Sequence, residues 1–198
     1  MFRIAALVSG GGTNLQAVLD AISAGKIPNA RVELVVSTNG QAFALERAKK
    51  AGIEAVVLEK SDFPDLKARE TALLSVLSDK NIDLVVFCGC LMILSEKFIE
   101  DWDKPIINIH PSLLPAYGGK GFHGLAVHEA VLSARETETG ATVHYVDGGI
   151  DTGKIILQKK VNVQPDDTAE ILQKRVMEEA EWQILPEVIA RFVKGELP

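Results

Sequence analysis

Short apolar runs recur along the first half of the chain, and helical stretches separate them. Such runs, each bounded by polar or turn-forming residues, are typical of buried strands. The runs expected to be strands are residues 2–9, 31–37, 54–58 and 83–88. The stretches expected to be helices are residues 15–24, 42–51 and 65–80. This alternation predicts an α/β fold, a doubly wound and mostly parallel sheet with helices on both faces.

The second half continues the pattern with less regularity. A short helix at 95–102 precedes a strand that begins with Ile106, and a helix follows at 125–134. Two further strands are expected at 140–146 and 155–158. A long final helix is expected to begin at Asp167 or Thr168, where a side-chain oxygen can cap it. We expect Pro186 to interrupt or kink that helix, because proline lacks a backbone N–H. The whole chain, residues 1–198, is expected to form one domain.

Asn108 and His110 stand out at the end of the strand that follows Ile106. Two residues apart on an extended strand, their side chains share one face. Pro111 and Pro115 end the strand and stiffen the loop after it. An amide can donate to a developing oxyanion, and an imidazole can move protons near neutral pH. The pair suits attack on a carbonyl or formyl carbon; the alternative is a turn-capping Asn and a His bonded to its neighbours.

A glycine-rich loop between the last two expected strands carries two carboxylates, Asp147 and Asp151. We expect Asp151 to reach His110, and a carboxylate there would raise the pKa of the imidazole. An amide, an imidazole and a carboxylate together form a catalytic set, which weakens the purely structural alternative for Asn108 and His110.

The first strand is followed by three glycines, Thr13 and Asn14, and then by a helix. Backbone N–H groups at such a turn and the dipole of the helix favour an anion, so the loop is a candidate phosphate site. The sequence matches neither of the common glycine-rich nucleotide motifs. A tight turn that binds nothing is the alternative, and the motif alone does not decide between the two.

The motif Asn-Ile-His-Pro-Ser-Leu-Leu-Pro at 108–115, followed by Gly-Ile-Asp-Thr-Gly at 149–153, resembles the folate-dependent formyltransferases. The resemblance runs from about Ile4 to about Val193, and the loop at residues 10–14 narrows it to the branch that acts on glycinamide ribonucleotide. The resemblance implies 10-formyltetrahydrofolate as cosubstrate, no tightly bound cofactor and no metal.

The resemblance also assigns roles to individual residues. Those implied to be catalytic are Asn108, His110 and Asp151. Those implied to hold the phosphate and ribose of the ribonucleotide are Gly11, Gly12, Thr13, Asn14 and Glu181. Those implied to contact folate are Leu91, Met92, Ile93, Leu94, Asn108, His144 and Asp147.

The sequence departs from the family pattern at three positions. Gly11 and Thr13 stand where some relatives carry Asn and Ser. Met92 stands where relatives commonly have Arg, so a contact from that Arg cannot persist. Outside the motifs, we expect Lys120 to be solvated and His128 to be a partly exposed helix residue.

Composition narrows the possible partners. The chain is 47% hydrophobic, 24% charged and carries a net charge of -6. It has no basic footprint for nucleic acid and no apolar run that would span a bilayer. Cys88 and Cys90 are expected to be reduced thiols at a strand end, which fits a cytoplasmic protein. The expected partners are two small substrates, and the expected state is a monomer or homodimer.

The two halves of the domain are expected to have different roles. Residues up to about 100 would bind the ribonucleotide, and residues from about 101 to 198 would carry catalysis and folate binding. From the acidic charge and the end at Pro198, we do not expect the RNA-binding domain of the branch that formylates methionyl-tRNA. From the first strand at Phe2, we do not expect the extra N-terminal domain of the deformylase branch. A third alternative is a binding module that keeps the cleft without catalysis.

Overall fold

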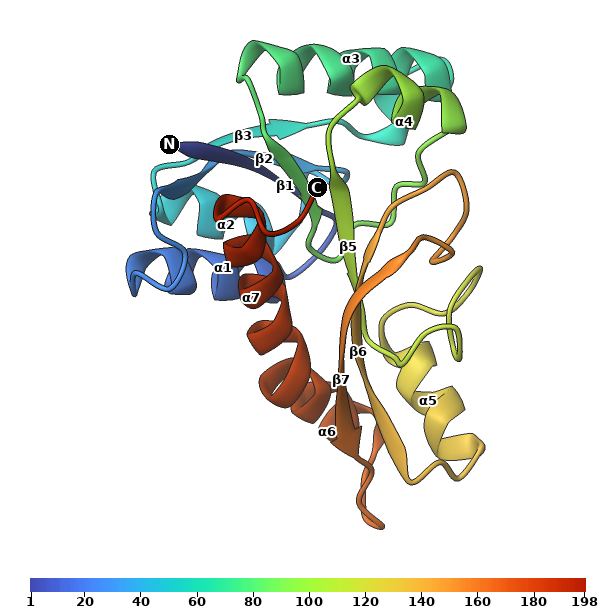
Figure 1. The fold of residues 1–198 in the computed structure, drawn as a ribbon. Coiled ribbons are helices and arrows are strands. Elements are labelled where there is room, and N and C mark those ends of the chain that lie inside the picture. The colour runs from blue at the N-terminus through green and yellow to red at the C-terminus, as the bar shows by residue number, and fades with distance from the viewer.

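The computed structural model describes all residues from 1 to 198, and one seven-stranded sheet forms its centre (Figure 1). The strands are β1 (Phe2–Val8), β2 (Ala30–Ser37), β3 (Glu54–Val57), β4 (Leu84–Phe87), β5 (Ile106–His110), β6 (Glu138–Tyr145) and β7 (Ile155–Asn162). Their order across the sheet is β3-β2-β1-β4-β5-β6-β7. The first five strands are parallel to one another. Strand β6 pairs antiparallel with β5, and β7 pairs antiparallel with β6. The predicted doubly wound, mostly parallel sheet is therefore confirmed.

Helices cover both faces of the sheet. They are α1 (Thr13–Ser23), α2 (Phe43–Lys50), α3 (Leu66–Asp79), α4 (Glu96–Trp102), α5 (Leu125–Ser133), α6 (Ala169–Val176) and α7 (Trp182–Val193), with a short 3-10 turn at Lys60–Asp62. One apolar core joins the sheet to α1, α2, α6 and α7, and the other joins it to α3 and α4. No helix is long and apolar enough to cross a membrane.

The first strand shows how the sequence produces two cores. Ile4, Ala6 and Val8 lie in the larger core, and Ala5 and Leu7 lie in the smaller one. Successive side chains of a strand point to opposite faces, so a strand covered on both sides must be apolar at every position. The unbroken run Ile4–Val8 is buried throughout, as this reasoning requires. Because β1 to β5 are parallel, their carboxyl ends lie together at one edge of the sheet.

The final helix differs from the prediction at Pro186. Helix α7 continues through this proline, which lies in its first half. The departure from α geometry comes earlier, at Met177–Glu181, where the chain forms a π-helical turn between α6 and α7. The Trp182 N–H donates to Met177 O there, five residues back. The helix is therefore not interrupted at Pro186, and the π-helical turn before α7 was not predicted.

Candidate active site

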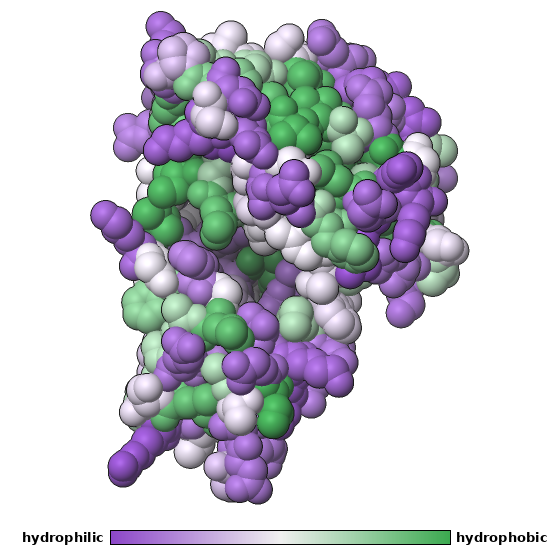
Figure 2. All heavy atoms as spheres, turned by 180° about the vertical axis from the view of Figure 1, so that it is seen from behind, coloured by the Kyte–Doolittle hydropathy of each residue, from purple (hydrophilic) through white to green (hydrophobic).

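A cavity of about 630 Å³ opens at the carboxyl ends of β1, β4 and β5. The face of the molecule turned away in Figure 1 is hollowed near its middle, with polar and apolar residues around the hollow (Figure 2). Every residue assigned to the site from the sequence lines this one cavity: Gly11, Gly12, Thr13, Asn14, Leu91, Met92, Ile93, Leu94, Asn108, His110, His144, Asp147, Asp151 and Glu181. Segments far apart in the chain therefore form a single site.

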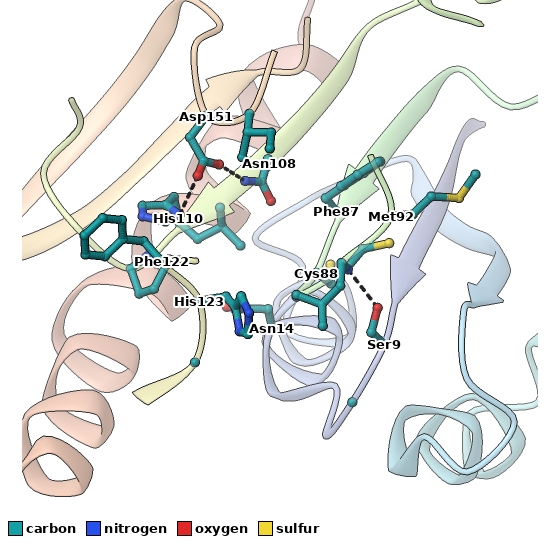
Figure 3. Close-up of a pocket in the computed structure, with 18 of the residues that line it drawn as sticks. Ser9, Asn14, Phe87, Cys88, Met92, Asn108, His110, Phe122, His123 and Asp151 are labelled. Atoms are coloured by element: carbon teal, nitrogen blue, oxygen red, sulfur yellow. Dashed lines mark hydrogen bonds and ion pairs between the residues drawn. The ribbon is translucent and has the colours of Figure 1, made fainter. Parts of the chain in front are cut away.

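Asn108, His110 and Asp151 meet at one side of the cavity (Figure 3). Nδ1 of His110 lies 3.4 Å from Oδ2 of Asp151. Nδ2 of Asn108 donates to Oδ1 of the same carboxylate at 3.3 Å. The predicted contact between Asp151 and His110 is therefore confirmed. It depends on the left-handed backbone of Asp151, whose φ is 57°, a conformation that Asp tolerates better than most residues.

The other ring nitrogen of His110 is also occupied. Nε2 lies 2.8 Å from the backbone oxygen of Tyr117, which can only accept. Nε2 therefore carries the hydrogen in the neutral ring, and Nδ1 presents its lone pair toward Asp151. A proton that arrives on Nδ1 would lie between the imidazole and the carboxylate.

Burial sets the charge state of His110. Its side chain is almost entirely buried, and this burial lowers its pKa below the usual value, although the nearby Asp151 carboxylate acts in the opposite direction. The upward effect expected of Asp151 is confirmed, but burial outweighs it. Desolvation penalises the charged imidazolium more than one partly screened carboxylate stabilises it. The ring is accordingly neutral near pH 7 and able to take up a proton.

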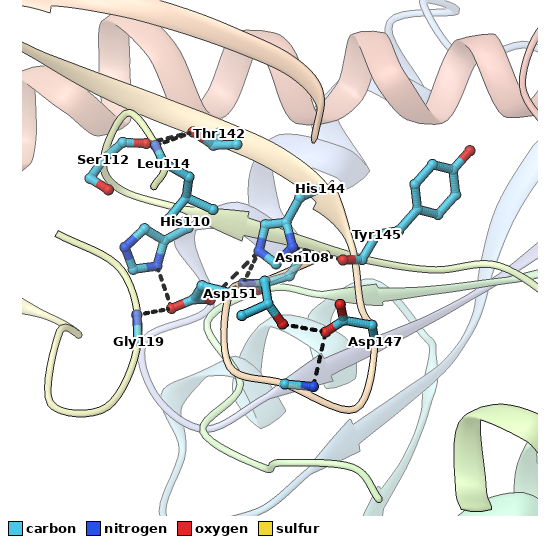
Figure 4. A network of polar contacts seen from close by, with 12 residues as sticks. Asn108, His110, Ser112, Leu114, Gly119, Thr142, His144, Tyr145, Asp147 and Asp151 are labelled. Carbon is cyan, nitrogen blue, oxygen red and sulfur yellow. Dashed lines mark hydrogen bonds and ion pairs between the residues drawn. The ribbon is translucent and has the colours of Figure 1, made fainter. Parts of the chain in front are cut away.

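His144 is buried beside Asn108 and orients its amide (Figure 4). Nδ1 of His144 donates to its neighbour's backbone oxygen, at Tyr145, over 2.7 Å. Nε2 is then an acceptor, and Nδ2 of Asn108 lies 3.1 Å from it. Both amide hydrogens of Asn108 are thus engaged, one by His144 and one by Asp151. An oxyanion that Asn108 is to stabilise would replace the longer of these bonds, the one to Asp151.

Asp151 is ionised in this environment. Burial raises its pKa, but the His144 and His110 rings and the Gly119 N–H together outweigh burial and lower it below the usual value. The Gly119 N–H donates to Oδ2 over 3.0 Å. The carboxylate therefore joins β5, β6 and the glycine-rich segment around Gly119 in one polar network.

The loop at residues 10–14 has the geometry expected of an anion site. Helix α1 begins at Thr13, and Gly12 before it adopts a left-handed φ of 70°. No side chain caps the helix, and its first residues, Thr13 and Asn14, line the cavity. A phosphate placed there would meet backbone donors and the positive end of the helix dipole.

Asn14 and Glu181 face each other at this end of the cavity. Nδ2 of Asn14 donates to Oε2 of Glu181 at 2.5 Å, and both side chains are buried. Oδ1 of Asn14 has no partner. The side chain expected to donate to a phosphate is thus committed to Glu181, and its free atom is an acceptor. Burial raises the pKa of Glu181 to about 7, although the Asn14 hydrogen bond acts in the opposite direction.

All four residues of the segment Leu91–Leu94 border the cavity, and every second one is also packed into the core. Leu91 and Ile93 are 62% and 53% exposed, and Met92 and Leu94 are buried in the smaller core. A flat apolar ligand would meet the two exposed side chains and the main chain. Met92 fills core space, so its difference from relatives leaves the apolar surface of this segment intact.

Several cavity residues escaped the sequence reasoning. His128 is fully buried, with no hydrogen-bond partner for either ring nitrogen, and burial lowers its pKa to about 4. It was expected to be partly exposed, but its face of α5 lies against the cavity. Lys120 and Phe122 also line the cavity. Only the density of glycines around Lys120 could have pointed to this loop.

No group of three or more His, Cys, Asp or Glu side chains is arranged to hold a metal ion. Asn108, His110 and Asp151 instead bring together an amide, an imidazole and a carboxylate. Such a set can bind an oxyanion and move a proton between an amine and a leaving group.

The fold and this site define a class of α/β enzyme that uses the carboxyl edge of its sheet for transfer chemistry. Residues 2–189 match the formyl transferase family, and the chain belongs to that family. It is 40% identical to a phosphoribosylglycinamide formyltransferase of Haemophilus influenzae, over 100% of this chain and 90% of the relative. It is 41% identical to the trifunctional purine biosynthetic protein adenosine-3 of Drosophila pseudoobscura pseudoobscura, over 98% of this chain but only 14% of that protein.

Solved structures agree with the sequence relatives. The glycinamide ribonucleotide transformylase 1 of Symbiobacterium toebii superposes with a TM-score of 0.92 at 40% identity, and the match covers 100% of this chain and 90% of that one. The phosphoribosylglycinamide formyltransferase of Coxiella burnetii gives a TM-score of 0.89 at 37% identity, over 98% and 88% of the two chains. The similarity thus extends over the sheet, both helical layers and the cavity.

Proposed function

We propose that this chain transfers the formyl group of 10-formyltetrahydrofolate to the primary amine of glycinamide ribonucleotide. The products are formylglycinamide ribonucleotide and tetrahydrofolate, a step of purine (IMP) synthesis. One observation carries the proposal: the anion loop and the set Asn108, His110 and Asp151 line the same cavity. Relatives with the corresponding names match nearly the full length of this chain, which supports the same activity.

The proposed step begins with attack of the amine nitrogen on the formyl carbon. A new C–N bond forms, and the formyl oxygen becomes an oxyanion. Asn108 donates to that oxyanion in place of its 3.3 Å bond to Asp151. Removing a comparable donor typically costs about 3–4 kcal/mol of transition-state stabilisation.

A proton must then move from the attacking amine to N10 of folate. Nδ1 of His110, neutral and unprotonated, accepts the proton, and Asp151 at 3.4 Å stabilises the resulting imidazolium. A water held by the carboxylate can complete the transfer to N10. The bond between the formyl carbon and N10 breaks, and tetrahydrofolate leaves with the proton.

The two substrates are proposed to bind at different parts of the cavity. In the proposal, Gly11, Gly12 and Thr13 hold the phosphate with backbone donors, and Glu181 contacts the ribose. Leu91 and Ile93 offer apolar surface to the folate ring, and Asp147 and His144 border the same lobe. The assignment of residues 1–100 to the ribonucleotide and of residues 101–198 to folate and catalysis is then not strict. In the proposal, Leu91 of the first half contacts folate, and Glu181 of the second half contacts the ribose.

The test is an absorbance assay of tetrahydrofolate formation from 10-formyltetrahydrofolate, with and without glycinamide ribonucleotide. Turnover that requires the ribonucleotide supports the transferase. Turnover without it would indicate hydrolysis, with water in place of the amine. If neither mixture turns over and both ligands raise the melting temperature, the chain is a binding module.

We also propose a cytoplasmic location and a monomeric or homodimeric state. Cys88 and Cys90 are free thiols, which fits a reducing compartment. Light scattering of the purified protein measures the mass, and a tetramer or larger species would contradict this part of the proposal.

A further inference from the structure

Helix α2 contacts the loop at residues 10–14 from outside the cavity. The Ala44 N–H donates to the backbone oxygen of Gly10 at 3.1 Å. Nε of Arg47 donates to the backbone oxygen of Gly11 at 2.8 Å. No residue of α2 lines the cavity. The helix therefore holds two consecutive carbonyl groups of the loop and leaves the opposite side of the loop free.

The direction of these carbonyls fixes the direction of the N–H groups. In a trans peptide unit, the carbonyl of one residue and the N–H of the next point in opposite directions. Gly10 O directed at α2 turns the Gly11 N–H away from α2, and Gly11 O directed at Arg47 does the same for the Gly12 N–H. Neither N–H has a hydrogen-bond partner within the protein, and both residues line the cavity. The N–H groups available to a phosphate are thus aimed by contacts behind the loop.

Arg47 is itself held in place. Nη1 donates to Oε1 of Gln16 on α1 at 3.1 Å, and the guanidinium lies 5.2 Å from the centre of the Phe43 ring. The side chain thus bridges α1, α2 and the loop. Its planar fork makes these two bonds from two separate nitrogens, whereas a lysine has a single donor nitrogen.

We infer that Arg47 is a positioning residue for the substrate phosphate, which holds the Gly11 carbonyl outward so that the Gly12 N–H faces the ligand. The inference rests on the proposed function for the identity of the phosphate, a ribonucleotide monoester. Without the guanidinium, the Gly11–Gly12 peptide unit is free to rotate, because glycine permits many backbone conformations. A carbonyl turned into the cavity would repel the phosphate oxygens.

The main test is Arg47→Met, which keeps the apolar stem against Phe43 and removes both the charge and the donors. We expect the KM for glycinamide ribonucleotide to rise about tenfold. The KM for 10-formyltetrahydrofolate and kcat should change less than about twofold, because Arg47 touches neither the folate lobe nor the reacting atoms. A fall in kcat with an unchanged KM for the ribonucleotide would overturn the inference.

Lys50→Met is the matched control, because Lys50 is an exposed cation in the last turn of the same helix. It removes the same charge without a contact to the loop. An equal rise in KM for both variants would assign the effect to general electrostatics and overturn the positioning role. Arg47→Lys keeps the charge and should recover only part of the affinity, and it also serves if Arg47→Met does not fold.

Direct binding separates this inference from the proposed function. Calorimetry with ribose 5-phosphate measures the loop without any turnover. If the native chain binds this probe, Arg47→Met weakens binding about tenfold and no formyl transfer occurs, the inference stands and the proposed reaction fails. If transfer occurs and Arg47→Met binds the probe as the native chain does, the inference fails alone.

Discussion

The carboxylate of Asp151 contacts the other two side chains of the proposed catalytic set. Asp151 accepts from Asn108 and Gly119 and lies 3.4 Å from Nδ1 of His110. It therefore orients the amide, fixes the neighbouring loop and faces the lone pair on Nδ1 of His110. The carboxylate is the group whose loss should separate binding from chemistry.

Asp151→Asn should lower kcat by about 10²–10⁴-fold, in line with the loss of a positioned acid-base group. The carboxamide has nearly the same shape, so the melting temperature and the Kd for glycinamide ribonucleotide should change little. Steady-state kinetics, calorimetry and thermal melting of the purified variant check the three quantities. Near-normal turnover would remove Asp151 from the catalytic set.

The acidic limb of the pH-rate profile should report His110. Burial lowers its pKa, with Asp151 acting the other way, so the neutral form needed as base persists below the usual value of about 6.5. The rate should therefore rise with pH through a midpoint below about 6.5. Asp151→Asn removes a contribution that raises the pKa, so the midpoint of its residual activity should move lower still. A midpoint above about 6.5 would mean that the carboxylate outweighs burial.

The lowered pKa of His110 also makes the stability of the folded chain depend on pH. The pKa of His110 is lower in the folded chain than in the unfolded one, so the unfolded state binds the proton first as the pH falls. The contribution of the neutral ring to stability is therefore complete above about pH 6.5 and declines below it. Denaturant titrations at several pH values, with NMR of the ring, measure both effects.

The shared direction of Asn108 and His110 was predictable because a two-residue period on a strand fixes the direction of side chains. The pKa direction of His110 was not predictable, because it depends on how many atoms of other segments surround the ring. The acceptor for its Nε2 is a backbone oxygen, at Tyr117. Backbone groups have no residue signature in a sequence, so no motif could have indicated this contact.

Among the elements, α3 fixes the position of the segment Leu91–Leu94, which we propose to bind folate, through Glu70. Its buried carboxylate accepts from the backbone N–H of Ser95 at 2.6 Å and from the Ser95 hydroxyl at 2.7 Å. Ser95 in turn caps α4 through Phe98 N at 3.1 Å. At the other end, the Leu91 N–H donates to Oγ of Ser9 at 2.8 Å. The segment Leu91–Leu94 is thus anchored at both ends.

Glu70→Gln should raise the KM for 10-formyltetrahydrofolate about fivefold, because one of the two bonds to Ser95 loses its acceptor. The KM for the ribonucleotide should stay unchanged. Asp79→Asn removes the same charge from an exposed position on α3 and provides the control. Equal effects on both substrates would show that Glu70 supports the fold in general instead of this segment.

Gly12→Val should raise the KM for glycinamide ribonucleotide and lower the melting temperature. A Cβ at Gly12 would lie 2.7 Å from Cβ of Ala44, so the loop would have to leave α2, and φ there is 70°. Gly25→Val is the control, because Gly25 has a φ of 73° but nothing within 4 Å of its Cβ position. It should lose stability through backbone strain with no change in KM. An unchanged KM for Gly12→Val would place the phosphate elsewhere.

Nearly all helices and strands lie where the hydrophobic pattern predicted them, within a few residues. The apolar runs that form β1 and β4 and the glycines that follow helices carry that information locally. The π-helical turn at Met177–Glu181 was missed, because it results from the fit of two helices to one sheet. Glu70 was missed because one buried carboxylate in a helix looks the same in sequence as a solvated one.

At the scale of the whole molecule, one sheet edge presents both lobes of the site. The lobe proposed for the ribonucleotide follows β1, and the proposed catalytic set lies on β5 and the loop between β6 and β7. The two substrates are therefore expected to bind together without overlap. That arrangement lets the fold bring an amine and a formyl group into contact, which is most of what such a transfer requires.

Ribose 5-phosphate and tetrahydrofolate should each raise the melting temperature, and their shifts should add. At 100 times its Kd, a ligand stabilises the native state by about 2.7 kcal/mol. For a chain of this size that corresponds to roughly 5–10 °C. Scanning calorimetry with each ligand alone and with both measures the sum. A joint shift no larger than the greater single shift would mean that the two compete for one lobe.

The number of residues in the π-helical turn sets the rotation of α7 relative to α6. One residue corresponds to about 100° of rotation in a helix. Insertion of one residue after Glu178 would therefore turn α7 by about that angle relative to α6. Either Glu181 would leave Asn14, or the apolar face that carries Leu185 and Val188 would turn toward water. This stretch should accept many substitutions on its exposed side but no single-residue insertion.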